Sequence, residues 1–505
     1  MEIRAKSIEH NPSAEVLRKY SESQPLARIS EFGNVNIQTQ ARARSRGSTL
    51  IVSDDPSRHT DPTIDRATYL EVAAGQDRYL AGQEVIMLDG FIGDHPDARI
   101  PTRLIVERSH AGLAAMQQLL YFPPEEPFEP ELTVIYTPNL PAPGYPDDRL
   151  IAVDLEQGVT RVLNSDYFGE SKMGGLRMWD AMMYRRGGLA MHSGLKVIDV
   201  DGRRRVGLIV GLSGTGKTTT TFSEQFHSRP AQDDFVALHP GGRVYGTEAG
   251  TFAKVYGLTE ESEPIVWAGV QSPRTYLENV AQDEKGRLDF FDTSITENSR
   301  AIISADDLPG FLPPQEVERA DFLLLLNRNT NIIPAVAGLG REHAAAYFML
   351  GETQGTSAGG AAEAGKFLRI PGTNPFFSYR HELQANRLYE LLDTHPVEVY
   401  VLNTGRVGGP QDDKRGKDVR PEHTGAIVAG IAAGTIRWED DPDFGYQVAA
   451  DVPGIDDREL LQPRRLYERQ GRGDEYRSRV EQLTEDRRAH LQNYDLLFPE
   501  IARAI

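Results

Sequence analysis

A phosphate-binding loop constrains this chain more than any other feature. Residues 211–218 read Gly-Leu-Ser-Gly-Thr-Gly-Lys-Thr and fit the pattern G-x-x-x-x-G-K-[ST]. The apolar run 206–210 comes directly before the loop, and threonines continue the chain after Lys217. This order predicts a buried strand, a loop and the first turn of a helix. The loop's backbone N–H groups would close around phosphate oxygens, with Lys217 neutralising the β and γ phosphates and the Thr218 hydroxyl ligating a divalent metal. The alternative is a glycine-rich turn with a surface lysine.

Two adjacent carboxylates follow the loop. An ordinary P-loop ATPase also carries an acidic residue at the end of a long apolar strand. Here the apolar run 322–326 ends in Asn327-Arg328-Asn329, without a carboxylate. Asp233 and Asp234 come soon after Lys217 instead. Paired carboxylates close behind a phosphate loop favour metal binding, on the logic of metal-assisted phosphoryl transfer. The alternative is a solvated acidic turn.

The composition sets wider limits. With 505 residues, two or three domains are expected, and the 39% hydrophobic and 26% charged content is that of a folded chain. There are no cysteines, which excludes disulfides, zinc–thiolate sites, iron–sulfur clusters and thiol nucleophiles. A net charge of -19 argues against nucleic acid as a partner. No apolar run is long enough to span a membrane, and the start lacks the plan of a secretory signal, so we expect a cytoplasmic enzyme.

The distribution of apolar runs predicts the fold class. Short continuous runs at 85–88, 132–136 and 322–326 are typical of buried strands and alternate with helical patterns, so we expect an α/β or mixed α+β protein. The stretch 354–365 is rich in Gly and Ala, as in a linker or a mobile lid. The apolar stripe from Tyr476 to Phe498 predicts a terminal helix packed on the body.

Several further motifs give the chain a specific resemblance. In order along the sequence they are Asp89-x-Phe91-x-Gly93, Tyr167-Phe168-Gly169-Glu170 with Lys172, Met191-His192-Ser193, Glu248-x-Gly250-x-x-Ala253-Lys254, Leu277-Glu278-Asn279-Val280, Thr296-Glu297-Asn298-Ser299-Arg300 and Leu402-Asn403-Thr404-Gly405. Together with the phosphate loop and the Asp pair, they resemble the ATP-dependent phosphoenolpyruvate carboxykinase family, colinearly from about residue 30 to 470. The resemblance implies a two-domain fold of that family with a P-loop-containing C-terminal nucleotide-binding domain. The expected domains are a substrate-side domain at 1–187 and a nucleotide- and metal-binding domain at 188–505, with a mobile lid near 352–368.

The resemblance also implies roles for the residues around the phosphate loop. Lys217 would bridge the transferring phosphoryl group, and Thr218 would hold the Mg²⁺ of the nucleotide. His192 and Asp234 would ligate a second, catalytic Mn²⁺ or Mg²⁺, and Asp233 would contact the shell of the nucleotide-bound metal. Imidazole and carboxylate ligands suit Mn²⁺ chemically.

Other implied roles concern the substrate and the nucleotide. Arg300 and Lys254 would stabilise phosphoryl charge. Arg44 would clamp the carboxylate of oxaloacetate or phosphoenolpyruvate, and Tyr167 would lie beside the substrate or CO2. Thr424, with Arg420 or Arg415 nearby, would hold adenine. The residues implied to bind ATP through the loop are Gly211, Leu212, Ser213, Gly214, Thr215, Gly216, Lys217, Thr218 and Thr219.

The sequence departs from the family pattern near the substrate. The family's E-M-K-K-G is here Glu170-Ser171-Lys172-Met173-Gly174, so Met173 stands where the family has a metal-ligating lysine. A thioether is a poor ligand for a hard cation, and Lys172 would have to replace the missing lysine. The segment that begins at Arg44 also lacks the lysines of the family's R-S-P-K-D-K.

Three hypotheses follow. The first is an ATP-dependent carboxykinase that converts oxaloacetate and ATP to phosphoenolpyruvate, ADP and CO2. The second is a kinase of the same fold with another acceptor and no decarboxylation, and the third is a nucleotide-binding homologue whose catalysis has decayed. A GTP-using enzyme of this fold is disfavoured because its phosphate loop carries a cysteine. The expected partners are small-molecule substrates, with no nucleic acid or membrane, in a monomer or small homo-oligomer.

Overall fold

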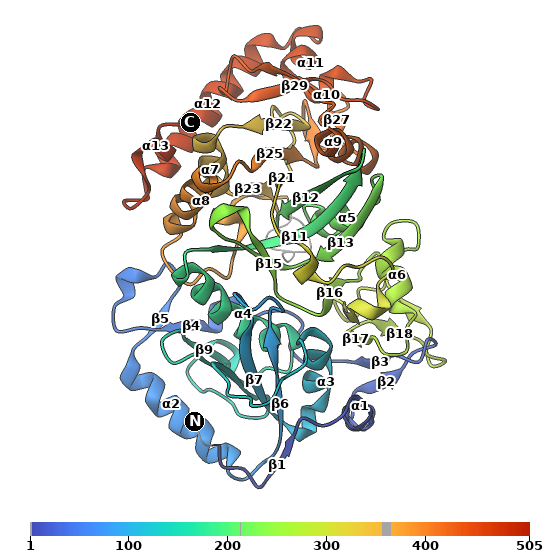
Figure 1. The fold of residues 1–505 in the computed structure, drawn as a ribbon, viewed down its shortest axis with the longest axis vertical. Helices are drawn as coiled ribbons and strands as arrows, with labels where there is room; N and C mark the ends of the chain where they lie inside the picture. The colour runs from blue at the N-terminus through green and yellow to red at the C-terminus, as the bar shows by residue number, and fades with distance from the viewer. Residues whose placement is uncertain (1–2, 213, 356–364) are drawn as a thin grey trace. The chain divides into compact units, whose positions relative to one another are not determined.

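The computed structural model describes residues 3–212, 214–355 and 365–505, coloured along the chain in Figure 1. The chain divides into two compact units. The first unit contains residues 1–186, 245–315 and 376–380, and the second contains residues 187–244, 316–375 and 381–505. After residue 187 the chain therefore re-enters the first unit twice, at 245–315 and at 376–380. A single boundary at 187/188 does not describe this division. As functional domains, 1–187 and 188–505 stay a prediction.

The first unit contains an eight-stranded mixed sheet in the order β1-β6-β7-β8-β10-β9-β4-β5. Its strands are β1 (Ser7–His10), β4 (Thr49–Val52), β5 (Thr63–Ile64), β6 (Glu84–Ile92), β7 (Ile100–Glu107), β8 (Leu132–Thr137), β9 (Leu150–Asp154) and β10 (Val159–Leu163). Its helices include α1 (Ala14–Glu22), α2 (Arg66–Leu80), α3 (Ala111–Leu120) and α4 (Phe168–Arg185). The strands expected at 85–88 and 132–136 are present within β6 and β8.

Helix α4 packs against β8, β9 and β10, and its glycines allow a close approach. A Cβ at Gly175 would lie 2.7 Å from Ile92 Cδ1, and one at Gly174 would lie 3.2 Å from Thr160 Cγ2. Larger side chains at these positions would push the helix away from the sheet. The packing matters for function because α4 carries several of the predicted site residues.

A second, five-stranded sheet of the first unit has the order β16-β20-β17-β3-β2. The strands are β2 (Ala27–Ile29), β3 (Val35–Ile37), β16 (Gly250–Lys254), β17 (Tyr276–Glu278) and β20 (Arg300–Ser304), with α6 (Pro264–Val270) packed against β20. Segments far apart in sequence thus become neighbours, since β3 pairs in parallel with β17.

The main sheet of the second unit runs β14-β11-β12-β21-β25-β22-β29-β28, with β13 paired to β11. The strands are β11 (Leu189–Val200), β12 (Arg203–Val210), β13 (His227–Gln232), β14 (Phe235–Leu238), β21 (Phe322–Asn327), β22 (Val336–Leu339), β25 (Glu398–Asn403), β28 (Arg437–Asp440) and β29 (Gln447–Asp451). β12, β21 and β25 are mutually parallel, so their carboxyl ends meet at one edge. The apolar runs 206–210 and 322–326 form these buried central strands, as predicted.

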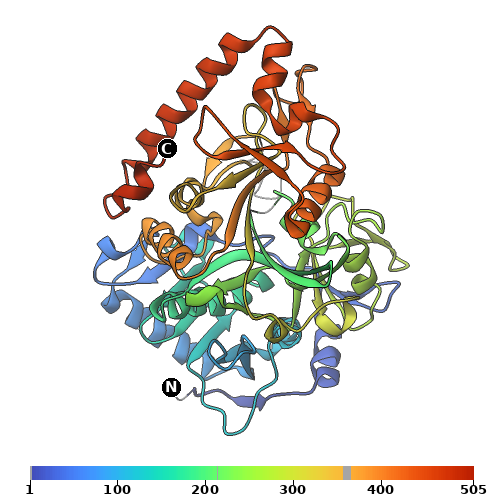
Figure 2. The same cartoon turned by 45° about the horizontal axis from the view of Figure 1, so that its top comes forward.

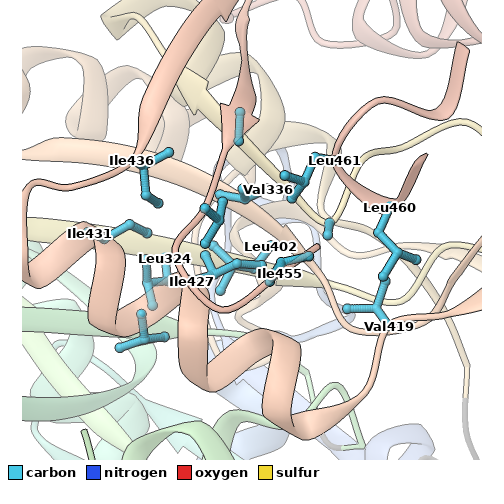
Figure 3. Close-up of a cluster of buried hydrophobic side chains, with 14 of the residues drawn as sticks. Leu324, Val336, Leu402, Val419, Ile427, Ile431, Ile436, Ile455, Leu460 and Leu461 are labelled. Carbon is cyan, nitrogen blue, oxygen red and sulfur yellow. The ribbon is translucent and has the colours of Figure 1, made fainter. Parts of the chain in front are cut away.

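A large apolar core supports this sheet. Leu324 of β21, Val336 of β22 and Leu402 of β25 pack with Ile427 and Ile431 of α9 (Pro421–Ala433) (Figure 3). All of these side chains are buried. Burial of side chains of this size contributes about 1.5–3 kcal/mol each relative to exposure, so the core fixes the strands that carry the phosphate loop.

The C-terminal segment corrects one expectation. The helix predicted from Tyr476 to Phe498 is α12 (Gly473–Leu491), seen in Figure 2 as the long red helix, and the last residues of the stripe lie beyond its end. Tyr494 and Phe498 still pack with Leu491 against α7 (Arg341–Leu350) and α8 (Glu382–Thr394). The chain turns after α12 and then forms the short α13 (Pro499–Ala502). The helical spacing of apolar residues in the sequence therefore continues beyond the end of α12.

The remaining helices of the second unit are α5 (Lys217–Phe222), α10 (Arg458–Leu461) and α11 (Pro463–Arg469). The expected lid near 352–368 includes β23 (Glu352–Gln354) and β24 (Phe367–Arg369), which pair with each other, whereas residues 356–364 lie outside the described residues. Within the described ranges, no helix has both the length and the apolar character to cross a membrane. The mixed α/β class expected from the sequence is confirmed.

Candidate active site

The phosphate loop lies where its sequence predicts. β12 ends at Val210, the loop follows, and α5 begins at Lys217. Gly214 and Gly216 have φ values of +84° and +93°, which residues with a Cβ rarely adopt. A Cβ at Gly211 would lie 2.4 Å from the hydroxyl of Thr215. The glycines are therefore required by the backbone path of the loop.

Lys217 lies beside the two predicted metal carboxylates. The residue is 7% exposed, and its Nζ donates to the carbonyl of Asp233 and lies 3.4 Å from Asp234 Oδ1. The Thr218 hydroxyl donates to Asp233 Oδ2 at 3.1 Å. The structure thus brings together the loop lysine, the loop threonine and the Asp pair, all within the second unit.

His192 joins the same cluster from β11. Its Nε2 lies 2.9 Å from Asp234 Oδ1, so this one oxygen contacts both the imidazole and Lys217. The antiparallel pairing of β11 with β14 places His192 opposite Phe235, next to the aspartates in the chain. The N–H of Ser193 donates to the carbonyl of Asp234 at 2.8 Å, which holds the connection between β13 and β14 against β11.

The donor set fits divalent cations of the hard or borderline type. Asp233, Asp234 and Thr218 offer oxygen atoms and His192 offers a nitrogen, which suits Mg²⁺ or Mn²⁺. In the part of the chain that the structure describes, no group of three or more His, Asp or Glu side chains is placed to hold a metal. Phosphate oxygens and water would have to complete each coordination shell, which is how Mg²⁺ is usually bound beside nucleotides.

Lys172 and Met173 lie in α4 of the first unit. Lys172 Nζ is 2.9 Å from Glu248 Oε2, and both side chains are buried. The ammonium also lies 5.5 Å from the ring centroid of Phe252. An ammonium that is paired with a carboxylate must lose its proton before it can coordinate a metal. A metal-ligating role for Lys172 therefore stays a prediction.

A row of charged side chains crosses the five-stranded sheet. Lys254 of β16 lies opposite Arg300 of β20, and Arg300 lies opposite Glu278 of β17. Burial, with the Arg300 charge as the second cause, lowers the pKa of Lys254. Burial raises the pKa of Glu278 to about 8, so this carboxyl group is mostly neutral at pH 7 and does not cancel the two cations.

Asn298 connects this row to Tyr167. Its Oδ1 accepts from Arg300 Nη2 at 2.7 Å, and its Nδ2 donates to the Tyr167 hydroxyl at 3.0 Å. Burial raises the pKa of Tyr167, which therefore stays protonated and can donate a hydrogen bond. The structure thus links Tyr167 and Arg300, two predicted site residues that are far apart in sequence.

Arg44 belongs to the first unit, and its residue is exposed. Desolvation by surrounding protein nevertheless lowers the pKa of its guanidinium, and the charge of Arg177 adds to this effect. The residue is thus exposed to solvent while its guanidinium lies 5.0 Å from the ring centroid of Phe376.

The predicted nucleotide residues outside the loop lie at the start of α9. Arg420 is the N-terminal cap, is exposed and pairs with Glu422 at 3.1 Å, while Thr424 is buried in the first turn. In the loop, the hydroxyl of Thr215 donates to the carbonyl of Leu212 at 2.7 Å. Thr219 lies in α5, and Ser213 lies outside the described residues. Adenine binding by Arg420 and Thr424 stays a prediction.

Sequence reasoning missed several residues that hold the site together. The Thr404 hydroxyl donates to the carbonyl of Thr215 at 2.7 Å and anchors the loop to the end of β25. The buried Lys196 ammonium donates to the carbonyl of Thr220 at 2.9 Å at the end of α5, and burial lowers the pKa of Lys196 to about 7. Asn298 and Thr404 stand inside motifs that were noticed, so the motifs could have indicated them.

Comparison with known proteins gives a consistent result. Residues 6–458 match the family model described as "Phosphoenolpyruvate carboxykinase". A protein of Aeropyrum pernix named "Phosphoenolpyruvate carboxykinase (ATP)" is 30% identical over 501 residues, which cover 96% of this chain and 94% of that protein. Proteins of the same name from Brevibacillus brevis and Caldanaerobacter subterraneus are 31% and 29% identical, over 83% and 94% of this chain and 79% and 92% of theirs.

The mixed sheet with a phosphate loop after a central strand, and a lysine beside two carboxylates, defines a phosphoryl-transfer enzyme of the P-loop kind. The family match over nearly the whole chain is more specific. This chain belongs to the phosphoenolpyruvate carboxykinase family, as the motifs predicted.

Proposed function

We propose that this chain is an ATP-dependent phosphoenolpyruvate carboxykinase, which converts oxaloacetate and ATP to phosphoenolpyruvate, ADP and CO2. The observation that carries the proposal is the cluster of Lys217, Asp233, Asp234 and His192 at the phosphate loop. The family membership and the ATP in the names of the relatives support the same reaction.

The reaction divides between the residues as follows. Arg44 binds a substrate carboxylate and Tyr167 donates a hydrogen bond beside it. The bond between C3 and C4 of oxaloacetate breaks, CO2 leaves, and the electron pair remains as an enolate. The enolate oxygen attacks the γ-phosphorus of ATP while the bond to ADP breaks. Lys217, Arg300 and Lys254 stabilise the charge that develops on the phosphoryl oxygens.

Two divalent cations belong to this proposal. Thr218 and Asp233 would hold Mg²⁺ with the nucleotide, and His192 and Asp234 would hold Mn²⁺ or Mg²⁺ at the second site. When bound, the cations neutralise phosphate and enolate charge. A cytoplasmic location and a monomeric or small homo-oligomeric state stay predictions.

One observation favours a second candidate. Met173 stands where the family has a metal-ligating lysine, and Lys172 is paired with Glu248. A kinase of the same fold that phosphorylates another acceptor would need no decarboxylation site. A decayed homologue is disfavoured, because Lys217 and the Asp pair form contacts suited to a charged nucleotide site.

The decisive assay measures products. Purified protein is incubated with ATP, Mg²⁺ and Mn²⁺, with and without oxaloacetate, and phosphoenolpyruvate and ADP are quantified together. We expect equal amounts of the two products only when oxaloacetate is present. ADP without phosphoenolpyruvate, or ADP release driven by another metabolite, would exclude the carboxykinase and leave the kinase.

A variant pair tests the carboxylate site in the same assay. Arg44→Ala should raise the KM for oxaloacetate by about 10- to 100-fold, because a charge-assisted bond worth about 1.5–3 kcal/mol is lost. Arg58→Ala, an exposed arginine of the same unit, is the matched control and should leave the KM unchanged. Equal KM values in both variants would remove Arg44 from the proposed site.

A further inference from the structure

Two arginines of the first unit lie against one aromatic ring. The guanidinium carbon of Arg44 is 5.0 Å from the ring centroid of Phe376, and that of Arg177 is 5.6 Å from the same centroid. The face of an aromatic ring attracts cations, so the ring stabilises both groups at one place. Arg177 is 5% exposed, whereas Arg44 is open to solvent.

One buried carboxylate faces this pair. Glu170 Oε2 lies 3.6 Å from Arg177 Nη1, and Glu170 Oε1 accepts from the backbone N–H of Ser45 at 2.6 Å. Glu170 and Arg177 are seven residues apart in α4, about two helical turns, so they share a face of the helix. Glu170 therefore fixes the backbone next to Arg44 while it is paired with Arg177.

The charges of the cluster do not balance. Arg44 and Arg177 carry positive charges, as does Arg46, whose charge also acts on Arg44, whereas Glu170 carries one negative charge. Arg177 Nη1 and Glu170 Oε2 are both buried, and neither atom forms a hydrogen bond with the described part of the chain. Buried charged groups that lack hydrogen bonds are costly, and an anion beside Arg44 would offset the excess positive charge.

We propose that Arg177 is a specificity-determining residue of the carboxylate site: with Glu170 it positions Arg44, and it adds to an excess of positive charge that selects an anionic substrate. The inference rests on the proposed function, in which Arg44 binds the substrate carboxylate. Arg177 supplies from α4 a positive charge near the segment 44–49, which lacks the lysines found there in the family pattern.

The test measures binding without turnover. Affinities for phosphoenolpyruvate and for oxalate, a small dicarboxylate, are determined by isothermal titration calorimetry in the presence of Mn²⁺. Arg177→Met should weaken both about tenfold, and Arg177→Lys, which keeps the charge, should stay within about threefold of the wild type. Glu170→Gln keeps the oxygen that accepts from Ser45 but removes the negative charge, so it should tighten binding of both anions.

The matched control is Arg161→Met. Arg161 is another buried arginine of the first unit, bonded to Gln76 and Asp77 away from Arg44, so its loss should leave both affinities unchanged. Thermal unfolding of every variant separates loss of folding from loss of binding. A purely structural role predicts that Arg177→Met and Glu170→Gln both weaken binding. That result, or an Arg177→Met variant that binds like Arg161→Met, would overturn the inference.

The outcomes also separate this inference from the proposed function. If the wild type forms phosphoenolpyruvate but Arg177→Met binds both anions normally, the inference fails and the function stands. If the wild type forms none while Arg177→Met loses affinity for oxalate, the function fails and the role of Arg177 holds for another carboxylate substrate.

Discussion

Lys217 Nζ lies 3.4 Å from Asp234 Oδ1, so the phosphate-loop lysine forms an ion pair with a predicted metal ligand. The two groups restrain one another: the lysine pairs with a partly exposed carboxylate, and the carboxylate holds the lysine near the loop. A bound phosphate would give the ammonium a stronger anionic partner and would leave the aspartate available to a cation. Nucleotide and metal binding are therefore expected to support each other.

Lys217→Met should lower kcat at least 100-fold, a loss of about 2.7 kcal/mol of transition-state stabilisation, because the proposed role of Lys217 is to stabilise the charge on the transferring phosphoryl group. The structure also predicts a lower melting temperature without ligand, since Lys217 is buried and paired. Lys285→Met, an exposed lysine of the first unit, is the control for both measurements. Turnover within about tenfold of the wild type would contradict the role of Lys217.

Local patterns predicted the strand, loop and helix around Lys217 because each depends on nearby residues: an apolar run, glycines with positive φ and a helix start. Local patterns could not predict that Arg300 lies opposite Lys254 and Glu278 on neighbouring strands. That arrangement depends on which strands become neighbours in the five-stranded sheet, a consequence of the whole chain. Arg177 was missed for a similar reason, because an arginine in a helix is usually solvated.

The end of α12 illustrates a different limit. Tyr494 and Phe498 continue the helical period of the stripe, yet the chain has already left the helix at Leu491. Their side chains pack against the same core as Leu491. Apolar residues are needed at these positions because of that packing, whether or not the backbone is helical. The pattern correctly predicted which residues pack on the body of the protein but not where the helix ends.

Ionisation of Glu278 should lower both the stability and the activity of the enzyme at alkaline pH. Burial raises the pKa of this carboxyl group to about 8, so the folded state binds its proton more tightly than the unfolded state does. The free energy of unfolding should therefore fall as pH rises from about the unfolded carboxyl pKa to about 8, and then level off. Ionisation above pH 8 also places a negative charge opposite Arg300, so kcat/KM should decline there.

Glu278→Gln tests both effects. The amide keeps an oxygen that can accept from the backbone N–H of Phe168, a bond that Glu278 makes at 2.7 Å. The variant should show a flatter dependence of unfolding free energy on pH between 5 and 8, and its activity should no longer decline near pH 8. An unchanged alkaline limb in the pH profile of kcat/KM would assign that limb to another group.

Met173→Lys should restore a metal ligand that the family pattern contains. We expect a lower Mn²⁺ concentration for half-maximal rate, and tighter Mn²⁺ binding when free Mn²⁺ is measured by electron paramagnetic resonance. Met173 is buried, so the new ammonium is driven toward its neutral form, which is the form that coordinates. Met182→Lys, at a less buried position of the same helix, is the control. No change, or weaker binding, would show that the second metal site is built without this position.

The buried ion pair between Arg487 and Glu352 should contribute strongly to the stability of the second unit. The guanidinium of Arg487 is fully buried and bonds Glu352 Oε2 through Nε at 2.9 Å and Nη2 at 2.6 Å, which joins α12 to β23. Burial alone would raise the pKa of Glu352, but Arg487 and then Arg369 outweigh it and lower that pKa. This contribution to stability is therefore present above the pKa of an unfolded glutamate and is lost as pH falls through the folded value.

Arg487→Met should lower the free energy of unfolding by about 3–5 kcal/mol at pH 7, because it leaves a buried carboxylate with only Arg369 as its charged partner. The paired replacement Arg487→Met with Glu352→Gln should recover part of the loss, since no charge is then left unpaired. Denaturant unfolding at pH 7 and at pH 4 checks both statements. The difference between wild type and Arg487→Met should shrink at pH 4, where Glu352 of the variant is protonated. A cost of less than about 1 kcal/mol at pH 7, or one that is independent of pH, would show that this buried pair does not hold α12 to β23.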